Sequence, residues 1–283
     1  MLNTVTQGSP HATGPTRRPP RSQKQEYQEF LLQRIEEYKN TLPREELLRI
    51  GDEAVRDLES GAEQYLLTEV LLLEHVDRII MRRLKLPSFR RWAQNHRALR
   101  TAQREPTHWA LEPNDPVALR GRLLEAGDLA LVVGAAALPQ ALFIAAHDAE
   151  VFLLDQELGA VEAAEGRAVA EQLAGRFQAL VVNFGGWLPD LRPALVVVDA
   201  VAVSSAEGAA RESLIRGLQT CTTPGGLHVV LGMDPDAPQV LPLDSLQAHY
   251  SDWQVEKRKR RGSGGFVATK PPRQKDTPEN VSD

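Results

Sequence analysis

Large apolar residues recur at helical spacing through the first third of the chain. Tyr27, Phe30, Leu31, Ile35 and Tyr38 lie three or four positions apart or side by side, which places them on one face of a helix. This helix is expected to end near residue 40, and the pattern predicts three more helices, over residues 44–58, 64–84 and 88–104. Residues 25–110 are therefore predicted to form a helical N-terminal region.

From residue 115 onward, short continuous apolar runs alternate with helical segments. Further helices are expected over residues 117–126, 139–146, 159–175 and 206–220. The apolar runs have the length of strands and cover residues 129–133, 150–154, 179–182, 194–198 and 227–231. Strands that are apolar on both faces and alternate with helices indicate a parallel sheet covered by helices on both sides.

Two short strands near the end of the chain break this alternation. Residues 253–256 and 265–269 are joined by a basic, glycine-rich stretch and are predicted to pair as a β-hairpin. The predicted fold class is α/β. It is a Rossmann-like, doubly wound, mostly parallel sheet with a C-terminal antiparallel hairpin over residues 115–270, plus the helical N-terminal region.

The two ends of the chain have a different composition. Residues 1–24 and 271–283 are rich in proline and small or polar residues, so they are predicted to be disordered tails. The N-terminal segment lacks the apolar core of a secretory signal, and no run of ~20 apolar residues occurs. Cys221 is the one cysteine, which excludes an intrachain disulfide. We expect a cytoplasmic protein without a membrane-spanning segment.

Small and polar residues follow the predicted strands. The first four strands are followed or ended by Gly134-Ala135-Ala136, Asp155-Gln156, Asn183-Phe184 and Asp199. Because the carboxyl ends of parallel strands meet at one edge of a sheet, these residues are expected to lie together over a ligand crevice. Pro224-Gly225-Gly226 supplies a sharp turn before the fifth strand.

In the order of these motifs, residues 115–270 resemble the class I S-adenosylmethionine-dependent methyltransferases, whose Rossmann-like sheet has a reversed last strand. The resemblance implies that the protein binds S-adenosyl-L-methionine and transfers its methyl group to an acceptor that the sequence does not identify. It implies the following contacts: Gly134, Ala135 and Ala136 with the methionine part of the cofactor, Asp155 and Gln156 with the ribose, Asn183 and Phe184 with the adenine, and Asp199 with the substrate as a candidate catalytic group.

Each of the polar residues also has a structural interpretation. Asp155 is alternatively a loop residue or a helix cap, and Asp199 a solvated residue or the cap of the next helix. Asn183, followed by two glycines, is alternatively a turn residue. These alternatives require no ligand.

The glycine-rich loop of the family is reduced here to Gly134 followed by alanines, and Val132-Val133 replaces the usual acidic residue. This difference favours an alternative function, a non-catalytic methyltransferase-like binding or scaffold protein. A nicotinamide-dependent oxidoreductase is a third possibility, but the terminal hairpin and the missing glycines speak against it.

Charge is distributed unevenly although the net charge is -5. Nine Lys or Arg residues and no acid lie between Arg78 and Arg104, and a second basic cluster spans Lys257–Arg261. Such segments predict an anionic partner such as nucleic acid. The alternative is that the first segment pairs with the acidic residues between Glu36 and Glu74.

The histidines do not suggest a metal site, since none of the seven has ligand spacing. His228 lies inside an apolar strand and is expected to be a core residue. His108 and Trp109 either close over the cofactor or pack the two regions together.

Overall fold

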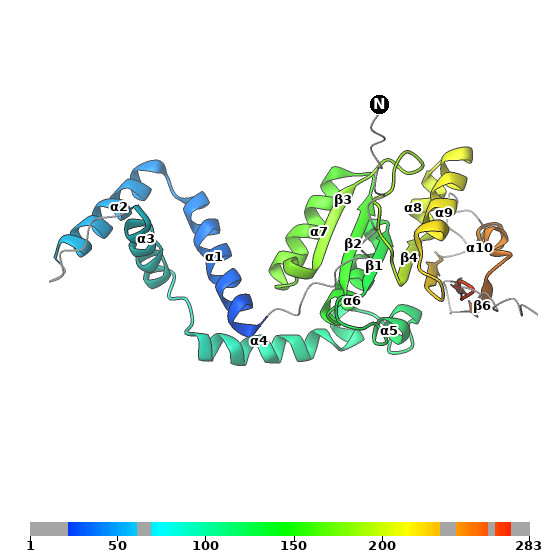
Figure 1. Cartoon of the computed structure of the whole chain (residues 1–283), viewed down its shortest axis with the longest axis horizontal. Coiled ribbons are helices and arrows are strands. Elements are labelled where there is room, and N and C mark those ends of the chain that lie inside the picture. The colour runs from blue at the N-terminus through cyan, green and yellow to red at the C-terminus, as the bar shows by residue number, and fades with distance from the viewer. Residues whose placement is uncertain (1–21, 61–68, 233–241, 260–263, 273–283) are drawn as a thin grey trace, which may run out of the picture. The chain divides into compact units, whose positions relative to one another are not determined.

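The computed structural model describes residues 22–60, 69–232, 242–259 and 264–272 (Figure 1). Its described residues divide into two compact units, one reaching to Ala102 and the other starting at Gln103. This boundary lies inside the helix predicted over residues 88–104, before the predicted end of the helical region at residue 110.

The first unit is helical, as predicted. Its helices are α1 (Gln23–Thr41), α2 (Arg44–Glu59), α3 (Glu69–Arg83) and α4 (Phe89–Gln103), the last residue of which belongs to the second unit. Because α1 begins at Gln23, the predicted N-terminal tail extends two residues too far. The Ser22 hydroxyl accepts a hydrogen bond from the Gln25 backbone N–H, and the Gln25 side chain accepts one from the Ser22 backbone N–H. This reciprocal capping box fixes the start of α1.

The core of this unit is small and aliphatic. Its fully buried members are Ile35, Ile50, Ala54, Ile79 and Ile80, contributed by α1, α2 and α3. The apolar stripe that predicted the first helix supplies Ile35 to this core. A separate aromatic group joins α1 to α4, where the ring of Trp92 lies 5.3 Å from that of Tyr27.

The second unit is built on a seven-stranded sheet with the order β3-β2-β1-β4-β5-β7-β6. The strands are β1 (Leu129–Val133), β2 (Glu150–Asp155), β3 (Phe177–Val181), β4 (Leu195–Asp199), β5 (Leu227–Leu231), β6 (Gln254–Lys259) and β7 (Gly264–Thr269). β1 to β5 are parallel, and β7 runs antiparallel between β5 and β6. The predicted fold class, including the reversed strand and the hairpin, is confirmed.

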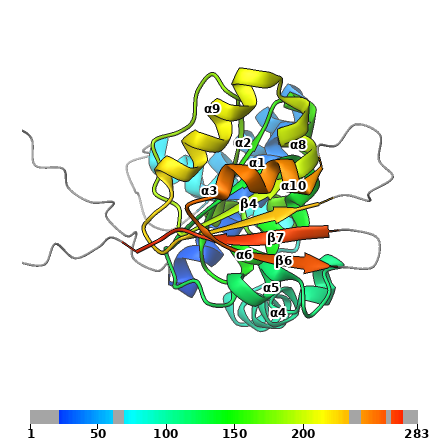
Figure 2. The ribbon, with the colours of Figure 1, turned by 90° about the vertical axis from the view of Figure 1, so that its right-hand side faces the viewer.

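Helices cover both faces of this sheet (Figures 1 and 2). The helices of the unit are α5 (Pro116–Gly121), α6 (Leu138–Ala146), α7 (Leu158–Ala170), α8 (Ala200–Ser205), α9 (Gly208–Cys221) and α10 (Leu243–Gln247). Short 3₁₀ turns are η1 (Pro106–Trp109), η2 (Ala135–Ala137), η3 (Ala174–Arg176) and η4 (Ala248–Tyr250). Side chains of α6 and α7 form the core on one face, and those of α8, α9 and α10 form the core on the other.

Four elements differ from the sequence-based expectation. α8 and α10 were not predicted, the helix expected over residues 117–126 ends at Gly121, and the helix expected over residues 159–175 ends at Ala170. Beyond the end of α5, the chain forms a turn in which the Glu125 backbone N–H donates to the Asp128 side chain at 2.8 Å. No helix among the described residues combines the length and the apolar composition that a membrane crossing needs.

Candidate functional site

The carboxyl ends of three neighbouring strands bring the predicted residues together. Pairing places Val133 of β1 beside Leu154 of β2 and Val198 of β4. The residues that follow these positions are Gly134, Asp155 and Asp199. The sequence motifs therefore meet at one edge of the sheet, as expected for a doubly wound fold.

Asp155 holds the loop that follows β1. Its Oδ2 accepts a hydrogen bond from the backbone N–H of Ala135 at 2.6 Å, and its Oδ1 accepts one from the backbone N–H of Glu157 at 3.0 Å. The carboxylate faces the loop and is half-buried. A carboxylate has about four acceptor positions, so two such bonds leave acceptor capacity for a further donor such as a hydroxyl.

The backbone conformation and the close packing at position 134 require a glycine. Its φ of 98° lies in the region that favours glycine. A Cβ on this residue would lie 2.7 Å from the Cβ of Ala202 and 2.8 Å from the Cβ of Asp199. The one glycine kept in the loop therefore lets the loop approach β4 and α8 closely, and α8 fills the space beside it.

Asp199 caps α8. Its two carboxylate oxygens accept hydrogen bonds from the backbone N–H groups of Val201 at 3.1 Å and Ala202 at 3.3 Å, and the residue is only 7% exposed. Burial raises the pKa of this carboxyl, the two N–H bonds oppose the rise, and the nearby negative charge of Asp155 adds to it. The structure therefore places Asp199 where the alternative interpretation, a helix cap, expected it.

Gln156 reaches across the end of β1. Its Nε2 donates to the hydroxyl oxygen of Ser205 at 3.2 Å, and Ser205 is the last residue of α8. Both side chains are exposed. The loop after β2 and the helix after β4 are thus joined over the carboxyl end of the strand that lies between them.

The segment after β3 forms the turn that the alternative interpretation expected. The backbone N–H of Gly186 donates to the carbonyl of Asn183 at 3.0 Å. Asn183 is exposed, whereas Phe184 is 4% exposed and packs in the core beneath α8 and α9. Of the two residues, Asn183 alone is accessible to a ligand.

Two exposed aliphatic residues flank Asp155 and were not identified from the sequence. Val181 ends β3 directly opposite Asp155 and is 49% exposed, and Leu158 opens α7 and is 59% exposed. No sequence signal marks them, because a strand end and a helix start are ordinary places for Val and Leu. Together with Asp155, they place apolar surface beside a carboxylate.

His108 and Trp109 do not approach this edge. Trp109 is 5% exposed in the core beside α6, and its Nε1 donates to the carbonyl of Gln103 at 2.7 Å. His108 Nε2 lies 3.3 Å from Oε2 of Glu171, which follows the C-terminal end of α7. That end of α7 lies at the opposite edge of the sheet, and Trp109 packs within the core of the α/β unit.

The basic segments are partly neutralised. Arg82 pairs with Asp57 at 3.3 Å, and Arg83 pairs with Glu46 at 3.0 Å and Glu53 at 2.5 Å. The alternative prediction, pairing with acids of the preceding helices, is thus confirmed for α3. In the hairpin, Lys257 pairs with Asp244 at 2.9 Å. The side chains of residues 258–261 lie outside the described part of the chain.

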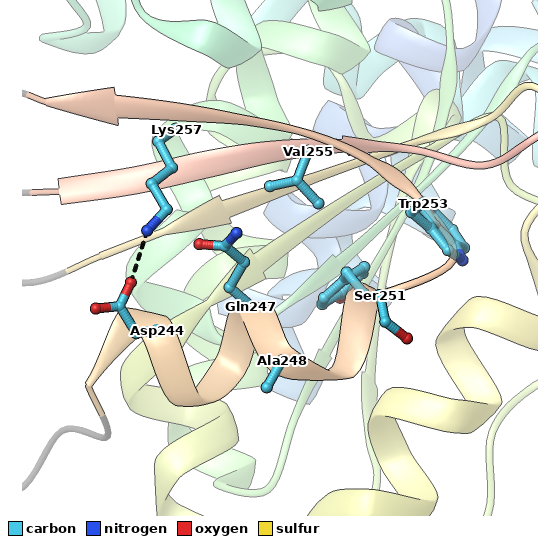
Figure 3. A pocket seen from close by; sticks show the side chains of 8 residues that line it. Asp244, Gln247, Ala248, Ser251, Trp253, Val255 and Lys257 are labelled. Carbon is cyan, nitrogen blue, oxygen red and sulfur yellow. Dashed lines mark hydrogen bonds and ion pairs between the residues drawn. The ribbon is translucent and has the colours of Figure 1, made fainter.

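A separate groove of about 450 Å³ lies between α10 and β6 (Figure 3). Its lining residues are Asp244, Gln247, Ala248, Tyr250, Ser251, Trp253, Val255 and Lys257. The ion pair between Lys257 and Asp244 spans it. None of the predicted cofactor residues contributes to this groove. Among the described residues, no group of three or more His, Cys, Asp or Glu side chains is arranged to hold a metal ion.

Comparison with known proteins finds similarity only to solved structures, and not to any family model or curated sequence. An O-methyltransferase family protein from Burkholderia thailandensis shares 14% identity over 56% of this chain and 58% of its own, with a TM-score of 0.44. The N-methyltransferase NodS from Bradyrhizobium japonicum shares 15% identity over 56% of this chain and 99% of its own, with a TM-score of 0.44.

The glycopeptide N-methyltransferase MtfA, solved with S-adenosyl-L-homocysteine, shares 14% identity over 54% of this chain and 87% of its own, with a TM-score of 0.45. This chain spans less than two thirds of the length of the Burkholderia protein. Similarity at this level concerns the fold, and the fold assignment itself rests on the observed strand order.

Proposed function

We propose that the α/β unit is an S-adenosylmethionine-dependent methyltransferase of the class I type acting on an unassigned acceptor. The observation that carries this proposal is the position of Asp155, at the carboxyl end of β2 with its carboxylate against the loop after β1. In an open α/β sheet this is where the ribose of a nucleotide-like ligand is bound by an acidic side chain.

The residues present fit an adenosyl group at one end of the site. Asp155 retains acceptor positions for the ribose hydroxyls, and the exposed side chains of Val181 and Leu158 offer apolar surface for a flat base. Asn183 supplies an exposed amide at the same edge. The methionine part of the cofactor would have to lie against the loop that starts at Gly134, and α8 packs closely against that loop.

S-Adenosylmethionine would supply a methyl group on a sulfonium, so this chain needs to provide mainly placement and electrostatics. Asp155 would orient the ligand, and the alanines after Gly134 would allow close approach of the backbone. Asp199 would act on the substrate only if α8 moved, because the residue caps that helix and is only 7% exposed.

A non-catalytic binding or scaffold function is the second candidate. It is favoured by the close packing of Asp199 and Ala202 against Gly134, which leaves no room for a Cβ at that position. For the methyltransferase and for the scaffold function alike, we also propose an anionic partner such as nucleic acid, attracted by the basic segments, and a cytoplasmic location.

Isothermal titration of the full chain with S-adenosylhomocysteine tests the proposal. Wild-type protein is expected to bind. Asp155→Asn is expected to bind at least about tenfold more weakly, since an amide offers one acceptor oxygen in place of two. Asp252→Asn is the matched control, because Asp252 is exposed in the turn before β6.

If wild-type protein releases no heat and its melting temperature does not rise with the ligand, the methyltransferase proposal fails. Binding without transfer to any acceptor would favour the scaffold function. Equal affinities of Asp155→Asn and Asp252→Asn would place the adenosyl group elsewhere.

A further inference from the structure

Three arginines of α4 differ in their partners from Arg82 and Arg83 of α3. Arg82 and Arg83 on α3 are paired with carboxylates. In the part of the chain that the structure describes, Arg90, Arg91 and Arg97 have no carboxylate partner. Arg97 donates Nε–H to the carbonyl of Ala93 in its own helix at 3.2 Å. The three arginines are exposed, so their charges face solvent.

These arginines share one face of α4 with two amide side chains. Arg90, Gln94 and Arg97 follow one another at intervals of four and three residues, and Arg91 and Asn95 form a parallel row. All five are exposed, and α4 contains no Asp or Glu. We call these five residues the outer face of α4.

The opposite face of α4 fixes the direction in which the outer face points. Trp92 is 3% exposed and packs its ring 4.5 Å from that of His96 and 5.3 Å from that of Tyr27 on α1. His96 Nε2 lies 3.2 Å from Oε2 of Glu26, also on α1. Because α1 takes up this side, the rows of arginines and amides are turned away from the packed aromatic group.

Two of the arginines occupy positions where the helix itself repels positive charge. Arg90 and Arg91 stand in the first turn of α4, where unpaired backbone N–H groups already give a positive potential. In α1 and α2 the basic residue of the first turn is accompanied by glutamates, Lys24 by Glu26 and Arg44 by Glu45 and Glu46, whereas the first turn of α4 has no acid. A bound anion would offset the repulsion at the start of α4.

The geometry points to nucleic acid as the partner: we propose that the outer face of α4 binds the phosphodiester backbone of a nucleic acid. Arginines contact phosphates, and the adjacent amides of Gln94 and Asn95 have the donors and acceptors that contact base edges. An amphipathic helix that lies in an acidic membrane surface buries an apolar face as well as presenting basic residues, and the outer face has no apolar residue. This surface belongs to the helical unit and does not depend on the proposed methyl transfer.

Fluorescence anisotropy of the full chain with a labelled DNA duplex and a labelled single-stranded RNA tests the proposal at several salt concentrations. The test variant is Arg90→Gln/Arg91→Gln/Arg97→Gln. The matched control is Arg34→Gln/Arg49→Gln/Arg56→Gln, which removes the same charge from exposed positions on α1 and α2. Equal melting temperatures of the two variants establish that both are folded.

Wild-type protein is expected to bind one of the two nucleic acids, with affinity that falls as salt rises. The α4 variant is expected to lose at least about tenfold in affinity. Its slope of log affinity against log salt should be shallower by about 2 to 3, close to one for each lost phosphate contact. The control variant should keep most of the affinity. Gln94→Glu, a single exposed change, should weaken binding as well.

Three results would overturn the proposal. The first is absence of binding to both nucleic acids at low salt. The second is an equal loss in the α4 variant and in the control, which would mean a response to total charge. The third is binding to vesicles of acidic phospholipid but not to nucleic acid, which would assign the outer face to a membrane surface.

Discussion

Nε2 of His228 lies 2.8 Å from the hydroxyl oxygen of Thr222 in the core of the α/β unit. That hydroxyl donates its own proton to the carbonyl of Leu218 at 2.6 Å, so the imidazole must carry the proton on Nε2. Nδ1 is then the acceptor for the hydroxyl of Tyr250 at 2.9 Å. One continuous network of hydrogen bonds thereby joins β5, the C-terminal end of α9 and η4.

His228 is expected to stay neutral well into the acidic range. Complete burial lowers its pKa from 6.5 to about 3, and the charge of Lys270 acts in the same direction. The unfolded chain takes up this proton below about pH 6.5 and the native chain does not. The contribution of His228 to the free energy of unfolding is therefore fully present above that pH. It falls by about 1.4 kcal/mol per pH unit as the pH drops toward 3. Nitrogen chemical shifts of the imidazole measure the tautomer, and titration of His228 above about pH 5 would contradict the network.

Tyr250→Phe removes the hydroxyl that satisfies Nδ1 of His228. Burial raises the pKa of Tyr250, so this hydroxyl is a neutral donor at any ordinary pH. Its loss leaves a buried acceptor unpaired and is expected to lower the free energy of unfolding by about 1–3 kcal/mol in urea titration. His249→Gln, at the exposed neighbouring position, is the control and should change stability by less than about 0.5 kcal/mol.

Gly134→Ala is expected to destabilise the unit by about 1–3 kcal/mol. The new Cβ would require both a strained φ and displacement of α8 from the loop. Gly166→Ala is the matched substitution in the interior of α7, where a Cβ meets nothing within 4 Å. It should stabilise the protein by up to about 1 kcal/mol, since alanine favours a helix. Urea unfolding of the two variants should give opposite signs. Equal signs would mean that the loop is not held as described.

Lys270→Met tests the C-terminal end of α9. Nζ of Lys270 donates to the carbonyls of Gln219 and Thr222, each at 2.6 Å, where the helix ends. Removing a charged donor from these carbonyls should cost about 1–2 kcal/mol. Lys257→Met removes an exposed ion pair instead, for which a cost near zero is expected. Similar losses in the two variants, measured by thermal unfolding, would show that Lys270 does not cap α9.

The parallel strands were recognisable in the sequence because each is a continuous apolar run between helical segments. The run predicted over residues 194–198, for example, corresponds to β4, which is buried throughout. The same approach missed α8. Val201 and Val203 are weak helix formers, and this six-residue helix exists because Asp199 caps it and Val203 packs into the core.

The sequence predicted that Gly134, Asp155 and Asp199 lie together at one edge of the sheet, but it did not predict their contacts. Spacing alone placed Asp155 at the strand end, whereas its hydrogen bond to Ala135 depends on the register of β1 against β2. The family resemblance implied that Phe184 contacts the adenine. The turn directs the phenyl ring into the core instead.

The bond from the backbone of Ala135 to Asp155 has an evolutionary consequence. A carboxylate that braces a loop is preserved by selection for folding, whether or not the protein still has a substrate. If the proposed methyl transfer holds, lineages that have lost it should keep an acid at this position, while Asn183, Val181 and Leu158 vary freely. Conservation or loss of those three residues among homologous proteins would then distinguish homologues that have the activity from homologues that have lost it.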